Sequence, residues 1–276
     1  MKLFVTGGTG FIGGHFLKQA LAARHEVVAL RRPGGKTRIP LPPDTSWLDG
    51  NLDGDWSVTL SKCDVFVHLA AAGVSPQKAD WNELFDVNVR QSLNLWRQAV
   101  NAGVKRLVIC GSCFEYGKSG ERFEFIPADA PLEPTNAYAA SKAAATMAAL
   151  ALAIEAQIEL IVLRPFHVFG EGQHESNFWP SLRRAALADG DFPMTAGEQM
   201  RDFIPVETVA DVFVGAIART DLRAGESKIE NVGTGKPQTL RAFAGHWWKQ
   251  WGAKGKLKIG ALSYRTGEVM RYVPRI

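Results

Sequence analysis

The feature that most constrains the fold of this chain is a glycine loop near its N-terminus, in which Gly7, Gly10 and Gly13 give the spacing GxxGxxG. A β-rich run, residues 2–6, precedes the loop, and a run with helical apolar spacing, residues 11–23, follows it. Glycine allows a tight turn and a close approach of the backbone to a pyrophosphate, and the free N–H groups of a helix N-terminus attract that anion. The position of the loop therefore predicts a dinucleotide-binding site.

Beyond the loop, short β-rich runs alternate with longer helical patterns, as in repeated βαβ units. Strands are predicted at residues 2–6, 26–30, 65–69, 105–110, 159–163 and 228–232, and helices at 11–23, 80–102 and 138–156. This alternation predicts an α/β fold with a Rossmann-type, doubly wound parallel sheet. The pattern becomes irregular after Pro165. We therefore expect a dinucleotide-binding domain at 1–165 and a smaller C-terminal substrate-binding lobe at 166–276, with about 204–235 returning to the Rossmann side.

Composition limits the class of protein and its location. A chain of 276 residues with 46% hydrophobic content can bury one large core. The longest apolar stretch, residues 143–154, is too short and too rich in alanine to span a bilayer, so no membrane partner is expected. The N-terminus lacks the order of a signal peptide, which makes the cytoplasm the expected location. No metal site is indicated.

Cysteine content and charge are less informative. Three cysteines are too few for a disulfide framework, and Cys110 and Cys113 follow an apolar strand, so the CxxC spacing indicates packing rather than redox chemistry. Residues 241–276 carry eight Lys/Arg against Glu268 alone, together with three tryptophans. This basic tail is compatible with a nucleic-acid patch, with a lobe that holds the diphosphate of a small substrate, or with a solvated helix face, which composition alone favours. We expect no nucleic-acid partner.

The end of the second predicted strand indicates which dinucleotide binds. An acidic residue there would accept hydrogen bonds from the ribose 2′-hydroxyl of NAD. The sequence instead has Arg31 and Arg32, whose guanidinium groups suit the 2′-phosphate of NADP. NADP is therefore the expected cofactor, although two arginines could also simply begin a surface loop.

Tyr138 and Lys142 are four residues apart and therefore lie on one face of the helix predicted at 138–156. A nearby cation favours phenolate over phenol. It would lower the pKa of the tyrosine and let the residue exchange a proton with an alcohol or a carbonyl group. By itself, this spacing also occurs by chance in many helices.

Nearly the whole chain resembles the extended short-chain dehydrogenase/reductases, in particular the NAD(P)-dependent epimerase/dehydratase family of nucleotide-sugar enzymes. The motifs that carry the resemblance are the glycine loop, the YxxxK pair, and the segments DVFVHLAA (64–71), NV (88–89), GSCFEYG (111–117), LRPFHVFG (163–170), RDFIPV (201–206) and NVG (231–233).

The resemblance implies roles for individual residues. It assigns catalysis to Ser112, which would bind the substrate oxygen, to Tyr138 as acid/base, and to Lys142, which would also hold the nicotinamide ribose. The cofactor residues that it implies, besides Lys142 and the two arginines, are Gly7, Gly10, Phe11, Ile12, Gly13, Asn51, Leu52, Leu69, Ala70, Ala71, Asn88, Pro165, Phe166 and Val168. The implied substrate residues are Ser112, Asn177, Arg201 and Arg265. His167 replaces a usual asparagine and is either packed or a substrate contact, whereas His68 is expected in the core.

The resemblance leaves the reaction open among several alternatives. Dehydratases of the family place an Asp-Glu pair after the serine or threonine, whereas this chain has Cys113 and Phe114, which cannot do that acid/base work. Epimerases keep NAD, which the two arginines do not favour. The leading hypothesis is thus NADPH-dependent reduction of a 4-keto-6-deoxy nucleotide sugar. The alternatives are an NAD-dependent nucleotide-sugar 4-epimerase and a non-catalytic dinucleotide-sensing protein.

The predicted helices at 80–102 and 138–156 carry more apolar surface than one face of a sheet needs. A two-fold helix-bundle homodimer, which is common in the family, would bury that surface.

Overall fold

Seven parallel strands form the sheet on which the predicted site residues lie. The computed structural model describes residues 1–74 and 80–276. Within them the strands follow the order β3-β2-β1-β4-β5-β6-β11, with parallel pairing throughout. The strands are β1 Lys2–Thr6, β2 Glu26–Arg31, β3 Ser46–Asp49, β4 Val65–His68, β5 Arg106–Cys110, β6 Glu159–Pro165 and β11 Ser227–Val232. The strand order reverses between β1 and β4, and doubly wound sheets bind ligands at that switch point.

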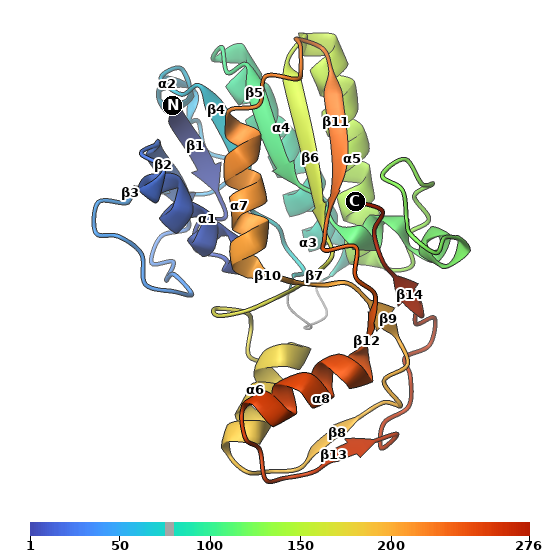
Figure 1. Cartoon of the computed structure of the whole chain (residues 1–276). Coiled ribbons are helices and arrows are strands. Elements are labelled where there is room, and N and C mark those ends of the chain that lie inside the picture. Colours follow the sequence, from blue (N-terminus) through green and yellow to red (C-terminus); the bar gives the residue numbers. More distant parts are fainter. Residues whose placement is uncertain (75–79) are drawn as a thin grey trace.

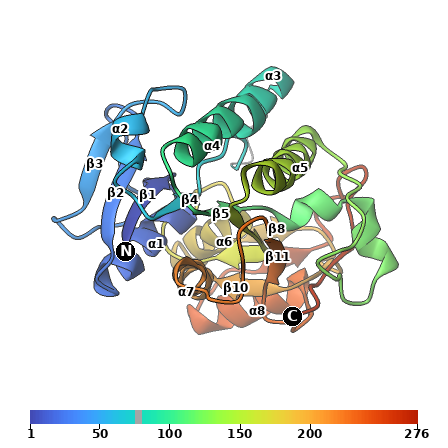
Figure 2. The same ribbon diagram turned by 90° about the horizontal axis from the view of Figure 1, so that it is seen from above.

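Helices cover both faces of the sheet (Figure 2). They are α1 Phe11–Ala22, α2 Ser57–Leu60, α3 Trp81–Phe85, α4 Ser92–Asn101, α5 Ala137–Ala156 and α7 Val206–Ile217. On one face α1 packs against α7, and Phe16 and Phe213 lie in the shared core. On the other face α4 and α5 bury Trp96 and Ala149 against the strands. Each face of the sheet is thus covered by an apolar core, and the glycine loop follows the central strand β1.

The remaining elements form a smaller lobe below the carboxyl ends of the strands (Figure 1). Its helices are α6 Phe178–Leu187 and α8 Leu240–Gln250. Two parallel strand pairs belong to it, β8 Phe192–Met194 with β13 Leu257–Ile259 and β7 His167–Phe169 with β10 Phe203–Pro205. A third small sheet has β9 Met200–Arg201 between β12 Gln238–Thr239 and β14 Arg271–Tyr272. Leu182, Met194 and Trp248 lie in the core of this lobe. Because α7 and β11 pack with the sheet, the chain passes between the lobes more than once.

The predicted strands agree with the structure to within two residues at each end, and the helix ends to within one. The helical segment that begins at Trp81 is interrupted by a π-helical turn, η1 Asp86–Gln91, where regular α-helix was predicted. The helix α5 is long and apolar enough, by length and composition alone, to cross a membrane, a test that core helices of soluble proteins also pass. In this structure α5 packs against β6 and α4 and carries two of the predicted catalytic residues.

Candidate active site

The glycine loop packs so closely against neighbouring backbone that no side chain fits at two of its glycines. Gly7 has φ +75°, and a Cβ atom there would lie 2.4 Å from the Ala70 nitrogen. At Gly13 a Cβ atom would lie 2.0 Å from the Gly7 carbonyl oxygen. Gly10 is the N-cap of α1, and because glycine has no side chain, none caps the N–H groups of the first turn. Those N–H groups are left available on the side of the loop. This arrangement fits the pyrophosphate of a dinucleotide.

At the end of β2 the structure adds a carboxylate that the sequence pattern did not reveal. Arg31 donates from Nε to Asp49 Oδ1 at 2.7 Å, and its guanidinium lies 5.0 Å from the centre of the Trp47 ring. The hydrogen bond with Arg31 lowers the pKa of Asp49. Arg32 is exposed at the start of the following loop. Of the two arginines predicted to bind the 2′-phosphate, Arg31 already pairs with a carboxylate, whereas Arg32 is exposed.

Several predicted cofactor residues lie at the carboxyl ends of β3 and β4. Asn51 is exposed, its carbonyl oxygen accepts the Trp56 Nε1–H at 3.0 Å, and Leu52 packs against the core. The residues after β4 follow the first strand closely, since Leu69 N–H donates to the Thr6 carbonyl at 3.1 Å. The half-buried residues of this edge are Phe11, Ile12, Leu69, Ala70 and Ala71.

Asn88 connects this edge to the catalytic helix. Its side-chain oxygen accepts the Ala72 N–H at 2.7 Å, and its amide nitrogen donates to Ser141 Oγ at 2.9 Å. Ser141 in turn donates to the Tyr138 carbonyl at 2.8 Å. The residue lies in the π-helical turn, a feature often found at functional sites. Asn88 is therefore a bridge between the loop after β4 and α5, in addition to its predicted cofactor role.

The structure brings the three predicted catalytic residues together. Ser112 lies two residues after the end of β5 and caps the 3₁₀ turn η2, Cys113–Tyr116. Tyr138 lies in the first turn of α5, where the Ser112 side chain is near enough to influence its pKa. Lys142 is one turn further along, 5% exposed, and donates from Nζ to the Cys110 carbonyl at 2.7 Å. A buried ammonium, a phenol and a hydroxyl group thus converge at the ends of β5 and α5.

The pKa of Tyr138 differs from the expectation drawn from the YxxxK spacing. Burial raises the pKa of the phenol, and the nearby Ser112 side chain opposes this shift only in part. The ammonium of Lys142 is engaged by a backbone carbonyl instead. The protein by itself therefore keeps Tyr138 protonated, as a proton donor must be.

A buried ion pair that was not predicted lies beneath Ser112. Glu115 is fully buried; its Oε1 accepts the Ser112 N–H at 2.8 Å, and its Oε2 accepts from Thr146 Oγ1 at 3.0 Å and from Arg164 Nε at 2.9 Å. Arg164, 1% exposed, also donates to the Tyr116 hydroxyl at 3.0 Å. The network joins the ends of β5 and β6 to α5. The spacing of Ser112 and Glu115 is that of a capping box, the one sequence signal that could have revealed part of it.

The predicted substrate residues other than Ser112 lie in the smaller lobe and differ in accessibility. Arg201 is 7% exposed and donates to the Val269 carbonyl at 2.7 Å and to Glu268 Oε1 at 3.2 Å. Arg265 is exposed, and Asn177 precedes α6 without capping it. Arg201 is thus held by the protein itself, whereas Arg265 is open to solvent.

The remaining candidates lie around the end of β6. Pro165 and Phe166 are buried and Val168 is half-buried. His167 lies among aromatic rings, and its Nδ1 is buried and has no partner within residues 1–74 and 80–276. As expected, His68 is in the core, 2% exposed, between Thr6 and Ser92; burial lowers its pKa to about 3.

The two positions after Ser112 cannot serve as an acid/base pair. Burial raises the pKa of the Cys113 thiol to about 12, and that of Cys110 to about 11. Both thiols are free, as expected for packing residues. Phe114 has no titratable group.

Comparison with known proteins agrees with this geometry. The sequence profile of the NAD dependent epimerase/dehydratase family matches residues 3–233. This chain belongs to that family. Its members are NAD(P)-dependent enzymes of the extended short-chain dehydrogenase/reductase type, and they include nucleotide-sugar epimerases, dehydratases and reductases.

Individual relatives have different activities. The chain is 28% identical over 263 residues to UDP-glucose 4-epimerase of Corynebacterium glutamicum, covering 87% of this chain and 78% of that protein. It is also 28% identical over 253 residues to GDP-6-deoxy-D-mannose reductase of Pseudomonas aeruginosa, covering 87% and 77%. Among solved structures, UDP-glucose 4-epimerase of Thermus thermophilus in complex with NAD is similar, with TM-score 0.84, 26% identity, and coverage of 100% of this chain and 90% of that one.

Proposed function

We propose that this protein catalyses the NADPH-dependent reduction of a 4-keto-6-deoxy nucleotide sugar to its 4-hydroxy product. The observation that carries the proposal is the convergence of Ser112, Tyr138 and Lys142 beside Cys113 and Phe114. The first three residues supply a proton and orient a carbonyl group, whereas the other two offer no second acid/base pair for water elimination.

Each residue has a separate task in this reaction. Tyr138, whose pKa is raised by burial and which is therefore a phenol rather than a phenolate, donates its proton to the ketone oxygen. Ser112 polarises the same oxygen by hydrogen bonding. Lys142 donates to the Cys110 carbonyl, and from this position it would also hold the ribose next to the nicotinamide. When bound, NADPH supplies the hydride that the ketone carbon receives.

Preference for NADPH rests on Arg31 and Arg32. Arg32 is exposed and extends from the end of β2, where the 2′-phosphate would lie. Arg31 would have to share its guanidinium between that phosphate and Asp49. Arg32 is therefore the stronger candidate for the phosphate contact.

A second candidate function, NAD-dependent nucleotide-sugar 4-epimerase, is favoured by the same ion pair. Asp49 partly neutralises Arg31 and places a carboxylate near the end of β2, where NAD-binding proteins use an acidic residue. Several relatives are UDP-glucose 4-epimerases. A non-catalytic dinucleotide sensor is the least favoured alternative, because sensing would not require Ser112, Tyr138 and Lys142 together.

Binding of NADPH and NADH, followed by nicotinamide fluorescence, separates these functions. The double substitution Arg31→Ala with Arg32→Ala should weaken NADPH binding about a hundredfold and leave NADH binding unchanged. Arg183→Ala with Arg184→Ala, an arginine pair in the smaller lobe, is the matched control. If NADH binds as tightly as NADPH, or if NAD copurifies and does not exchange, the reductase proposal is wrong and epimerisation becomes the leading function.

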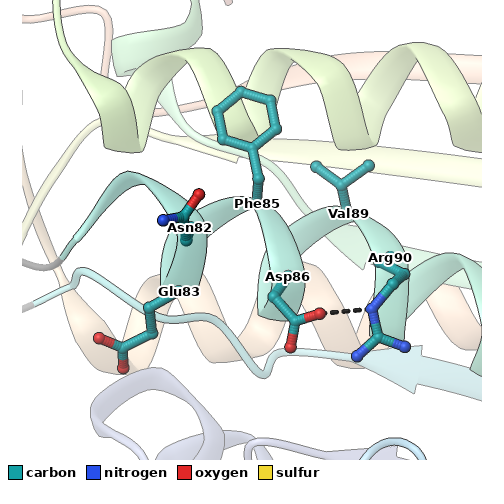
Figure 3. Close-up of a pocket in the computed structure, with 6 residues that line it drawn as sticks. All are labelled: Asn82, Glu83, Phe85, Asp86, Val89 and Arg90. Atoms are coloured by element: carbon teal, nitrogen blue, oxygen red, sulfur yellow. Dashed lines mark hydrogen bonds and ion pairs between the residues drawn. The ribbon is translucent and has the colours of Figure 1, made fainter.

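We also propose a homodimer through the helices that were predicted to carry surplus apolar surface. Trp81, Met147 and Ile154 are 57%, 58% and 63% exposed on α3 and α5. Figure 3 shows Phe85 and Val89 on the side of the same helical segment that faces α5, and both residues line a surface pocket formed by residues 82–90. Light scattering should give twice the monomer mass, and Met147→Glu with Ile154→Glu should reduce it to the monomer.

A further inference from the structure

Phe114 is the one exposed residue of the turn η2, whose other side chains are buried. Its neighbours Cys113 and Glu115 are 2% and 0% exposed, whereas the Phe114 side chain remains 38% exposed. The ring centre lies 6.5 Å from the Tyr138 ring. A group bonded to a carbon next to the reacting carbon can therefore reach the Phe114 ring while the carbonyl oxygen contacts Ser112 and Tyr138.

Two further rings extend this surface. His167 and Tyr272 lie 5.8 and 5.6 Å from Phe114, and each meets it edge to face. We call Phe114, His167 and Tyr272 the aromatic wall. The three residues come from η2, β7 and β14, so the wall joins the sheet domain to the smaller lobe.

The aromatic wall carries no charge, and the hydroxyl group of Tyr272 is already hydrogen-bonded within the protein. The Tyr272 hydroxyl donates to the Gly117 carbonyl at 3.3 Å. Burial and the nearby Arg201 guanidinium lower the pKa of His167 well below its usual value, so its imidazole is neutral. Arg201 itself is held by Glu268 and by a backbone carbonyl, and it lies 5.4 Å from the centre of the Tyr272 ring. Tyr272 is only 3% exposed, so the part of the wall that a substrate can contact is chiefly the apolar ring of Phe114, with the uncharged imidazole of His167 beside it.

We propose that the aromatic wall binds the methyl group of the substrate beside the reacting carbon, so that the enzyme selects 6-deoxy sugars against sugars with a 6-hydroxyl group. The inference rests on the proposed function and adds the structural reason for its substrate class. A methyl group gains apolar contact with the exposed Phe114 ring, whereas a hydroxyl group facing that ring would lose its hydrogen bonds to water without replacement. The expected preference is about ten- to a hundredfold in affinity.

Binding, measured without turnover, tests this selectivity. Tryptophan fluorescence is followed in the presence of saturating NADPH, with UDP-6-deoxyglucose against UDP-glucose and with GDP-6-deoxymannose against GDP-mannose. All four sugars carry the 4-hydroxyl group of a product, so cofactor and sugar are both reduced and no hydride is transferred. The 6-deoxy member should bind about ten- to a hundredfold more tightly in any pair that binds. Phe114→Asn should bring the ratio of the two Kd values close to one, and Phe114→Leu, which keeps the wall apolar, should retain most of it. Phe125→Asn, at a half-buried phenylalanine beside Arg271, is the matched control.

The outcomes separate the two levels of the proposal. If a pair binds without preference for the 6-deoxy member, or if the preference survives in Phe114→Asn, the inference about the aromatic wall is wrong and the reductase proposal stands. If neither pair binds, the nucleotide-sugar function is wrong, and the inference falls with it.

Discussion

Replacing Glu115 with glutamine should destabilise the protein by several kcal/mol, because the carboxylate neutralises a guanidinium that has no access to water. Glu115 and Arg164 are 0% and 1% exposed. A glutamine amide could still accept the Ser112 N–H through its oxygen, but its nitrogen would then face Arg164 Nε, and both are donors. Breaking a buried pair by removing one partner costs about 3–5 kcal/mol, a large part of the roughly 5–15 kcal/mol that stabilises a typical domain.

Urea unfolding of Glu115→Gln, Arg164→Met and the double variant measures this effect. The double variant leaves no unpaired charge, so its free energy of unfolding should fall by less than the sum of the two single losses. Thr146→Val removes only one neutral donor to the same carboxylate and should cost about 1 kcal/mol. A loss below about 1 kcal/mol in Glu115→Gln, or additive losses in the double variant, would refute the reasoning that burial makes this pair essential.

Three further predictions concern the cofactor site and the core. Asp49→Asn should release Arg31 and raise NADPH affinity severalfold relative to NADH, as measured by nicotinamide fluorescence; an unchanged ratio would mean that Arg31 does not reach the 2′-phosphate. Gly13→Ala, whose Cβ would lie 2.0 Å from a backbone oxygen, should abolish dinucleotide binding, whereas Gly215→Ala, with nothing within 4 Å of its Cβ, should not. Burial lowers the pKa of His68 from 6.5 to about 3, so the folded state disfavours protonation and the free energy of unfolding should fall as the pH drops below 6.5. His68→Gln should make that decline shallower in urea unfolding, and an equally steep decline would contradict the assignment.

Local patterns were sufficient to predict the parts of this fold that depend on neighbours in sequence. The alternation of strands and helices, the glycine loop and the four-residue spacing of Tyr138 and Lys142 are such patterns, and the structure contains each of them. The π-helical turn was not predictable in this way, because Asn88 bonds to Ala72 and Ser141, which lie 16 and 53 positions away. The same holds for Glu115 and Arg164, separated by 49 positions.

Electrostatics was the least predictable property, because it depends on which strands become neighbours. Arg31 by sequence alone indicates a phosphate ligand, but the parallel register of β2 with β3 places Asp49 directly opposite Arg31. The same guanidinium can then stabilise either a protein carboxylate or a cofactor phosphate. The pair is exposed, with side-chain accessibilities of 30% and 52%, so exchanging one anion for the other costs little. The preference for NADPH over NADH should therefore come mainly from Arg32. Asp49 should reduce that preference, because it competes with the 2′-phosphate for Arg31.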